Sequence, residues 1–165
     1  MTREWIPAHL KVTVGESAVA SAAASLSALL LEVPVWAMFV GWIAFFSRGG
    51  HLRQGLISLV CVLAGLVFGM AAASALAALG PHLGAATVGV VVFAVAMLVV
   101  SLRRLPVFNN LLGFFLGLVA WFAAHQPASL ANFAELAIAA TVGTLAGWLA
   151  SRVHHRWTPV AATPT

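Results

Sequence analysis

The chain has 165 residues, of which 62% are hydrophobic and only 7% are charged, and its formal net charge is +4. A water-soluble domain has about a quarter of its residues charged, so this composition excludes a soluble fold and predicts an all-α integral membrane protein with one domain. The single cysteine, Cys61, excludes a disulfide framework, and basic residues scattered over the ends of apolar segments argue against nucleic acid as a partner.

The N-terminal region predicts an interfacial segment followed by a first helix. Residues 1–13 contain Trp5 and two basic residues, a composition typical of a segment at the level of the lipid headgroups. Thr13 and Glu16 then form a capping-box pattern, in which each side chain bonds the backbone of the other. We therefore expect a helix over residues 14–31.

Two more helices complete the first half. A short connection at Glu32-Val33-Pro34 leads into a helix over residues 35–47, which is short for a membrane span of about 20 residues. A glycine-rich turn follows, and the third helix covers residues 54–79. Gly80-Pro81-His82 is expected to end it, because glycine and proline interrupt helices.

The second half predicts three further helices. Pro106 is expected to open the fifth of the six helices, and Asn132 with Glu135 forms a second capping-box pattern at the start of the sixth. The expected helices cover residues 85–102, 106–124 and 132–151. The transmembrane domain thus spans residues 14–152, and residues 153–165 form a basic and then Pro/Thr-rich tail.

The basic residues test this count of helices. With the N-terminus in the cytoplasm, all of them fall on the cytoplasmic side and none falls in the three outer connections. Such segregation is the positive-inside rule, and it would fail if one span were miscounted. The sequence therefore predicts six transmembrane helices with both termini cytoplasmic. The residues concerned are Arg3, Lys11, Arg48, Arg53, Arg103, Arg104, Arg152 and Arg156.

The two halves resemble each other. Residues 33–46 align with residues 105–122, so that prolines, glycines and aromatic residues match at Pro34 and Pro106, Trp36 and Phe108, Gly41 and Gly113, and Trp42 and Phe114. With three helices in each half, the repeats (about 14–80 and 83–152) must enter the membrane from opposite faces. Inverted repeats of this kind are typical of channels and transporters, whose sites lie near the midplane.

The aromatic residues of the second and fifth helices are candidate pore-lining residues. Trp42 and Phe114, with Phe39, Gly41 and Gly113 beside them, would form a narrow apolar constriction that suits small neutral or planar solutes. The alternative interpretation is that these aromatic residues face lipid and form interfacial belts.

The polar pair in the second half has two interpretations, and the spaced glycines have one. Asn109 and Asn110 either hydrogen-bond a solute or cap the start of the fifth helix. Small residues spaced four apart allow close helix packing, which we expect at Gly65, Gly69, Gly143 and Gly147.

Ionisable groups suggest little chemistry. Glu32 ends the first helix and is a possible coupling site for a proton or cation, although a solvated loop residue is the simpler interpretation. No histidine spacing or Cys–His combination typical of a metal site occurs, and no nucleophile–base pair or nucleotide motif is found. We therefore expect no metal, no cofactor and no enzymatic activity.

These features favour a passive channel or facilitator for a small neutral or weakly polar solute, such as urea or an amide, with the path between the second and fifth helices. The alternatives are a secondary transporter coupled through Glu32 or Glu135, and a scaffold subunit without transport activity whose small-residue faces bind partner helices. The lipid bilayer and the solute are the expected partners, and by analogy with small channels we expect a homo-oligomer.

The stretch from Val33 onward resembles the YcdZ-like family of uncharacterised bacterial inner-membrane proteins. The resemblance rests on the segment W-A-x-F-x-G, a double glycine and a G-L pair, at Trp36, Ala37, Phe39, Gly41, Gly49, Gly50, Gly55 and Leu56. A weaker match in the second half includes Pro106, Gly113 and Phe122. The resemblance implies a multi-pass protein of the bacterial inner membrane and carries no established activity.

Overall fold

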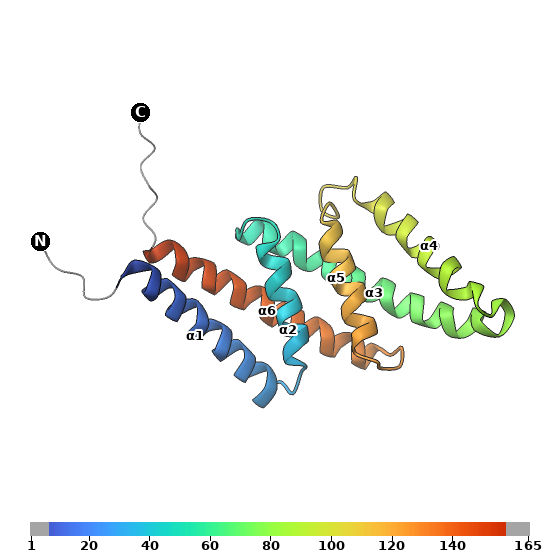
Figure 1. Ribbon diagram of the computed structural model, residues 1–165, viewed down its shortest axis with the longest axis horizontal. Coiled ribbons are helices and arrows are strands. Elements are labelled where there is room, and N and C mark those ends of the chain that lie inside the picture. Colours follow the sequence, from blue (N-terminus) through green and yellow to red (C-terminus); the bar gives the residue numbers. More distant parts are fainter. Residues whose placement is uncertain (1–6, 158–165) are drawn as a thin grey trace, which may run out of the picture.

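The computed structural model describes residues 7–157, and these residues form six helices joined by short connections (Figure 1). The number of helices and the all-α class agree with the sequence-based expectation. The helices are α1 (Ala8–Leu29), α2 (Val35–Phe46), α3 (Leu52–Leu83), α4 (Ala86–Leu102), α5 (Leu111–Ala123) and α6 (Leu130–Trp157).

Three of the helices, α1, α3 and α6, are long and apolar enough to cross a membrane, which makes the chain a multi-pass membrane protein. The other three are apolar but shorter, with 12 residues in α2, 17 in α4 and 13 in α5. At 1.5 Å per residue α2 is about 18 Å long, whereas the hydrocarbon core of a bilayer is about 30 Å thick. The short helices therefore depend on their neighbours for their place in the membrane.

The short helices α2 and α5 lie in the middle of the molecule, where α2 crosses α6 and α5 crosses α3 (Figure 1). α1 packs along α6 on one outer side, and α4 packs along α3 on the other. One edge of the molecule, called here the basic edge, is formed by the start of α1, the α2–α3 and α4–α5 connections and the end of α6; the other three connections lie along the opposite edge. Every Lys and Arg of the described residues falls in a segment of the basic edge.

The first helix begins earlier than the sequence suggested. α1 starts at Ala8 after Pro7, so Thr13 lies inside the helix, where its hydroxyl donates to the His9 carbonyl at 2.9 Å. The capping box predicted at Thr13 is therefore wrong, because the residues before it are themselves helical and leave no helix start to cap. Trp5 lies outside the described residues.

Predicted boundaries of α3, α5 and α6 are also wrong, and α6 extends to Trp157, into the predicted tail of residues 153–165. α3 continues through Pro81 and ends where Gly84 adopts a positive φ of 54°. α5 begins at Leu111, because Pro106 belongs to a turn before it. At the start of α6 the cap is Ser129, whose hydroxyl accepts from the Asn132 backbone N–H at 3.2 Å. Pro81 has no backbone N–H to donate to the Ala77 carbonyl, so the last turn of α3 forms without this hydrogen bond.

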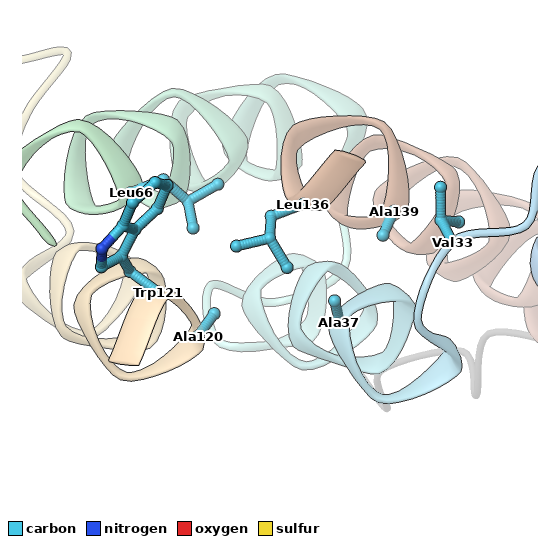
Figure 2. Packing of buried hydrophobic residues seen from close by; sticks show 7 residues of the cluster. All are labelled: Val33, Ala37, Leu66, Ala120, Trp121, Leu136 and Ala139. Carbon is cyan, nitrogen blue, oxygen red and sulfur yellow. The ribbon is translucent and has the colours of Figure 1, made fainter. Parts of the chain in front are cut away.

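The largest buried cluster joins four helices at the side away from the basic edge. Trp121 and Ala120 of α5 meet Leu66 of α3, while Ala37 of α2 lies beside Leu136 of α6 (Figure 2). Val33 and Ala139 complete this cluster, which contains no charged residue. Small side chains in this cluster let the short helices approach the long ones closely.

Candidate functional site

The contact between α2 and α6 is a backbone contact at glycines. A Cβ atom added at Gly41 would lie 1.8 Å from the Ala140 carbonyl oxygen, and one added at Gly143 would lie 1.7 Å from the Met38 carbonyl oxygen. Real Cβ atoms do not approach oxygen atoms this closely, so only glycine fits at both positions. We call this contact the α2–α6 seam.

The contact between α5 and α3 is built in the same way. A Cβ atom at Gly65 would lie 2.2 Å from the Phe114 carbonyl oxygen, and one at Gly117 would lie 2.1 Å from the Val62 carbonyl oxygen. We call this contact the α5–α3 seam. In each seam the short helix of one half of the chain packs against the long helix of the other half.

The two seams define which residues of the short helices correspond. Gly143 meets the carbonyl of Met38, as Gly65 meets that of Phe114. Likewise, a Cβ atom added at Gly147 would lie 3.0 Å from the Phe45 side chain, and one added at Gly69 would lie 2.5 Å from the Trp121 side chain. Met38, Gly41 and Phe45 therefore correspond to Phe114, Gly117 and Trp121.

This correspondence differs from the alignment of the two sequence segments, which paired Gly41 with Gly113. Gly113 and Gly117 stand four residues apart in α5. A spacing of four residues is close to one helical turn, so both glycines lie on the same face and the sequence pattern fits either pairing. The backbone contacts select Gly117.

The four central helices meet in a small apolar cluster, called here the central cluster. Ala44 of α2, Val62 of α3 and Ala140 of α6 are buried there. Val40, Leu59 and Leu116 pack against them. Under the correspondence of the seams Val40 matches Leu116, and Val62 matches Ala140, so the central cluster contains equivalent residues from both halves.

The candidate pore aromatics do not meet. Phe114 is fully buried and stacks on Phe68 with ring centroids 5.9 Å apart, in a cluster with residues of α3 and α4. Trp42 instead packs in a cluster of α1 and α6 residues, with the Phe46 ring 5.7 Å away. Phe39 is partly exposed beside Trp42. The structure therefore places Trp42 and Phe114 on different sides of the central cluster.

Asn110 joins three helices near the basic edge. Its side-chain oxygen accepts from the Gly113 N–H at 3.2 Å and caps α5. Its Nδ2 donates to the hydroxyl of Ser58 at 2.8 Å and to that of Ser47 at 3.2 Å. Asn110 is 6% exposed, and the capping alternative considered for it agrees with this geometry.

Asn109 is in a different environment from its neighbour. It is exposed, and its side-chain oxygen accepts a hydrogen bond from the guanidinium of Arg48. This bond joins the α2–α3 turn to the segment before α5. The two asparagines thus tie the α4–α5 connection to α2 and α3 from two directions.

Two buried hydroxyl groups were not identified from the sequence: Ser58, which bonds Asn110, and Thr144, which bonds a carbonyl of α2. Ser58 is fully buried in α3, and Thr144 is buried in α6 with its hydroxyl 3.0 Å from the Ala140 carbonyl and 3.4 Å from the Gly41 carbonyl. A hydroxyl group within a long apolar helix was the available signal, since such groups need a partner in lipid.

The carboxylates lie away from the central cluster. Glu32 is exposed in the α1–α2 connection, where it has a positive φ of 52°, and Glu135 lies half-buried in the first half of α6. Among residues 7–157, no group of three or more His, Cys, Asp or Glu side chains is placed to hold a metal ion.

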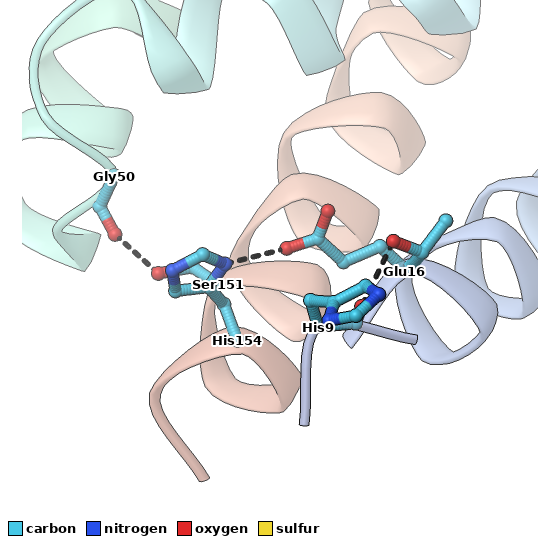
Figure 3. A network of polar contacts seen from close by, with 6 residues as sticks. His9, Glu16, Gly50, Ser151 and His154 are labelled. Carbon is cyan, nitrogen blue, oxygen red and sulfur yellow. Dashed lines mark hydrogen bonds and ion pairs between the residues drawn. The ribbon is translucent and has the colours of Figure 1, made fainter. Parts of the chain in front are cut away.

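Polar contacts fasten α6 to its neighbours at the basic edge. The Ser151 hydroxyl donates to the Gly50 carbonyl at 2.8 Å, and His154 Nδ1 lies 2.9 Å from a carboxylate oxygen of Glu16 (Figure 3). The first contact fixes the α2–α3 turn against α6, and the second joins α6 to α1.

Comparison with known proteins identifies a family. No curated protein and no solved structure matches the chain. The sequence does match the family described as "Protein of unknown function (DUF1097)" over residues 13–153, a range that includes the seams, the central cluster and Asn110. This match covers well over half of the chain, and the protein therefore belongs to the DUF1097 family.

Proposed function

We propose that this protein is a passive channel or facilitator for a small neutral or weakly polar solute, such as urea or an amide. The observation that carries the proposal is the repetition of the seam: two short helices, one from each half, each pack through glycines on the long helix of the other half. Channels and transporters with inverted repeats place their path between such halves, near the midplane.

The arrangement of the helix ends supports an inverted repeat. Each half has three helices, so equivalent ends of α2 and α5 belong on opposite edges of the molecule. The basic edge carries the described Lys and Arg residues, and under the positive-inside rule it would face the cytoplasm. Both termini would then be cytoplasmic. A place in the bacterial inner membrane, the expectation from the YcdZ-like resemblance, belongs to the same proposal.

The central cluster is the proposed narrow point of the path. It lies where α2, α3, α5 and α6 meet, and its side chains carry no charge. Hydrated ions are costly to pass through an apolar constriction, whereas a small neutral solute loses less hydration free energy there. The Asn110–Ser58 pair is a buried polar contact on the basic-edge side of the central cluster, and its groups are bonded within the protein. Phe114 packs toward α4 and lies outside the central cluster. We therefore assign the proposed constriction to Val40 and Leu116, the equivalent side chains from the two halves that pack in this cluster.

Solute flux into proteoliposomes tests this proposal. Vesicles are shocked with urea, formamide, glycerol or ammonium without an ion gradient, and re-swelling is followed by stopped-flow light scattering. Leu116→Ala widens the central cluster and should raise the flux of a permeant solute several-fold. Val119→Ala is the matched control, because Val119 lies on the same helix but is 63% exposed on its outer face. Absence of flux for every solute, or an equal rise in both variants, would overturn the proposal.

The same vesicles distinguish coupled transport. A passive path needs no gradient, and Glu32→Gln should leave its flux unchanged because Glu32 is exposed in a connection. Flux that requires a proton or cation gradient and is lost in Glu32→Gln would favour the transporter instead. A scaffold that binds partners through its small-residue faces is less well supported, since Gly65, Gly69, Gly143 and Gly147 are covered by α5 and α2.

A further inference from the structure

A cavity and a groove adjoin each other where α1 packs on α6. The cavity, of about 610 Å³, lies at the basic edge and is lined by Arg152, His155 and Arg156 above the apolar side chains of Val19 and Leu149. The groove, of about 360 Å³, runs down between the two helices from the same Val19 and Leu149. Only apolar side chains line the groove, among them Ala22, Leu26, Val142 and Leu145.

We propose that this cavity and groove together bind one anionic phospholipid. The phosphate group would lie between the guanidinium groups of Arg152 and Arg156, and an acyl chain would fill the groove between α1 and α6. Basic pockets between transmembrane helices on the cytoplasmic side suit anionic headgroups. The cationic cavity is continuous with the apolar groove. This favours a lipid over a free anion as the ligand, because a free anion would leave the groove unoccupied.

Charge around the cavity favours an anion. No carboxylate is among the described residues that line it. The carboxylate of Glu16 does not line the cavity, and one of its oxygens lies 2.9 Å from His154 Nδ1 (Figure 3). A second cavity of about 300 Å³, lined by Trp148, His51 and Ser151, adjoins Arg152 and enlarges the space for a headgroup. The Arg152 guanidinium lies 5.9 Å from the centre of the Trp148 ring, which positions its charge at the level where tryptophan prefers the lipid headgroups.

The equivalent groove in the other half lacks the cationic cavity. An apolar cavity of about 470 Å³ lies between α3, α4 and α5, and among residues 7–157 His125 is the one ionisable residue that lines it. Under the correspondence of the seams, Arg152, His155 and Arg156 of α6 match Ser74, Ala77 and Ala78 of α3. The two halves thus share an apolar groove, and only the α1–α6 groove has basic residues at its end. We therefore expect one anionic lipid per chain.

The test measures lipid binding by the purified full chain in a mild detergent. Native mass spectrometry counts bound dioleoyl-phosphatidylglycerol or dioleoyl-phosphatidylcholine, and thermal unfolding is followed with each lipid and with inorganic phosphate. The wild-type protein should bind one phosphatidylglycerol with a raised Tm, and it should respond little to phosphatidylcholine or phosphate. The double variant Arg152→Gln/Arg156→Gln should lose at least tenfold in affinity. The matched control is Arg103→Gln/Arg104→Gln, which removes two charges from the same edge at the α4–α5 connection.

A second pair of variants tests the groove. Ala22→Trp fills the groove from α1, whereas Ser21→Trp adds the same side chain at a neighbouring exposed position outside it. Only the first should weaken lipid binding. Equal losses in both arginine variants would indicate general charge attraction and overturn the proposal, as would equal binding of phosphatidylcholine. A Tm shift with phosphate alone, unaffected by Ala22→Trp, would indicate a simple anion site and would also overturn it.

Discussion

At the scale of single residues, Asn110 has more than one structural role. The same side chain caps α5 through Gly113 and bonds the hydroxyls of Ser58 and Ser47. Side-chain amides have one acceptor and two donor hydrogens, and here both ends of the group are used. The proline that the sequence suggested as the start of this helix lies in the preceding turn, and Asn110 takes the position at which the helix begins.

Replacement of Asn110 by alanine should destabilise the protein by about 1 to 3 kcal/mol, since it removes a helix cap and leaves the buried Ser58 hydroxyl without this partner. Asn109→Ala is the control. Its bond to Arg48 is exposed, and the loss should be below about 1 kcal/mol. Unfolding in mixed micelles of increasing denaturing detergent measures both. A cost for Asn110→Ala no larger than for Asn109→Ala would contradict the assigned role.

At the scale of elements, the short helices are held by backbone contact. α2 and α5 have too few residues to cross the hydrocarbon core upright, and each is attached to a long helix through two glycines whose partners are carbonyl oxygens. Contacts between Cα–H groups and carbonyl oxygens are individually weak, but close approach along a helix also brings many other atoms into van der Waals contact. Gly41 and Gly117 hold equivalent positions in the two seams.

Alanine substitutions test that equivalence. Gly41→Ala and Gly117→Ala should each destabilise the protein by about 1 to 3 kcal/mol, because a methyl group meets backbone in both seams. Gly113→Ala should cost less, since a Cβ atom added there would lie 2.9 Å from Cys61 Cβ and 3.1 Å from the Ser58 carbonyl oxygen, farther than the contacts at Gly41 and Gly117. A Cβ atom added at Gly89 would meet nothing within 4 Å outside its own helix backbone, so Gly89→Ala should be neutral or stabilising. Thermal unfolding in detergent gives the order; a Gly113→Ala cost that equals Gly41→Ala would favour the pairing suggested by the sequence alignment.

At the scale of the whole molecule, charge is separated between two edges. The described basic residues lie in the four chain segments of the basic edge, and the opposite edge contains Glu32 and uncharged connections. Such a distribution orients a membrane protein during insertion. It also explains why only one of the two apolar grooves ends beside arginines.

Cysteine labelling tests the orientation. In a Cys61→Ala background, Leu105→Cys marks the α4–α5 connection and Ala128→Cys marks the α5–α6 connection, and both positions are exposed. A membrane-impermeant maleimide should reach Ala128→Cys in spheroplasts and Leu105→Cys only in inverted vesicles. Labelling of both positions from the same side would contradict the proposed topology.

Composition and residue spacing were enough to predict an all-α membrane protein with six helices. The small fraction of charged residues indicated a membrane protein. Connections with glycine or proline separated six helices, and the predicted bounds of α2 and α4 lie within one residue of the observed ones. These features are local, so composition and spacing contain them. The predicted caps at Thr13 and Asn132 were wrong because residues of capping types also occur inside helices. The Thr13 hydroxyl bonds the His9 carbonyl one turn back. The Asn132 side chain lies in the first turn of α6 and donates to the Pro127 carbonyl in the connection before it.

The tertiary structure alone decided how the halves meet. Glycines four residues apart lie on the same helical face, so the pattern fitted both Gly113 and Gly117 as partners of the first half. The sequence around an aromatic residue in an apolar helix also does not show which neighbouring helix its side chain faces. In the structure Phe114 stacks on Phe68, whereas Trp42 packs against α1 and α6. Asn110 and Ser58 are 52 positions apart in the chain. Contacts of this range depend on how whole helices pack, and that arrangement is not contained in any single segment.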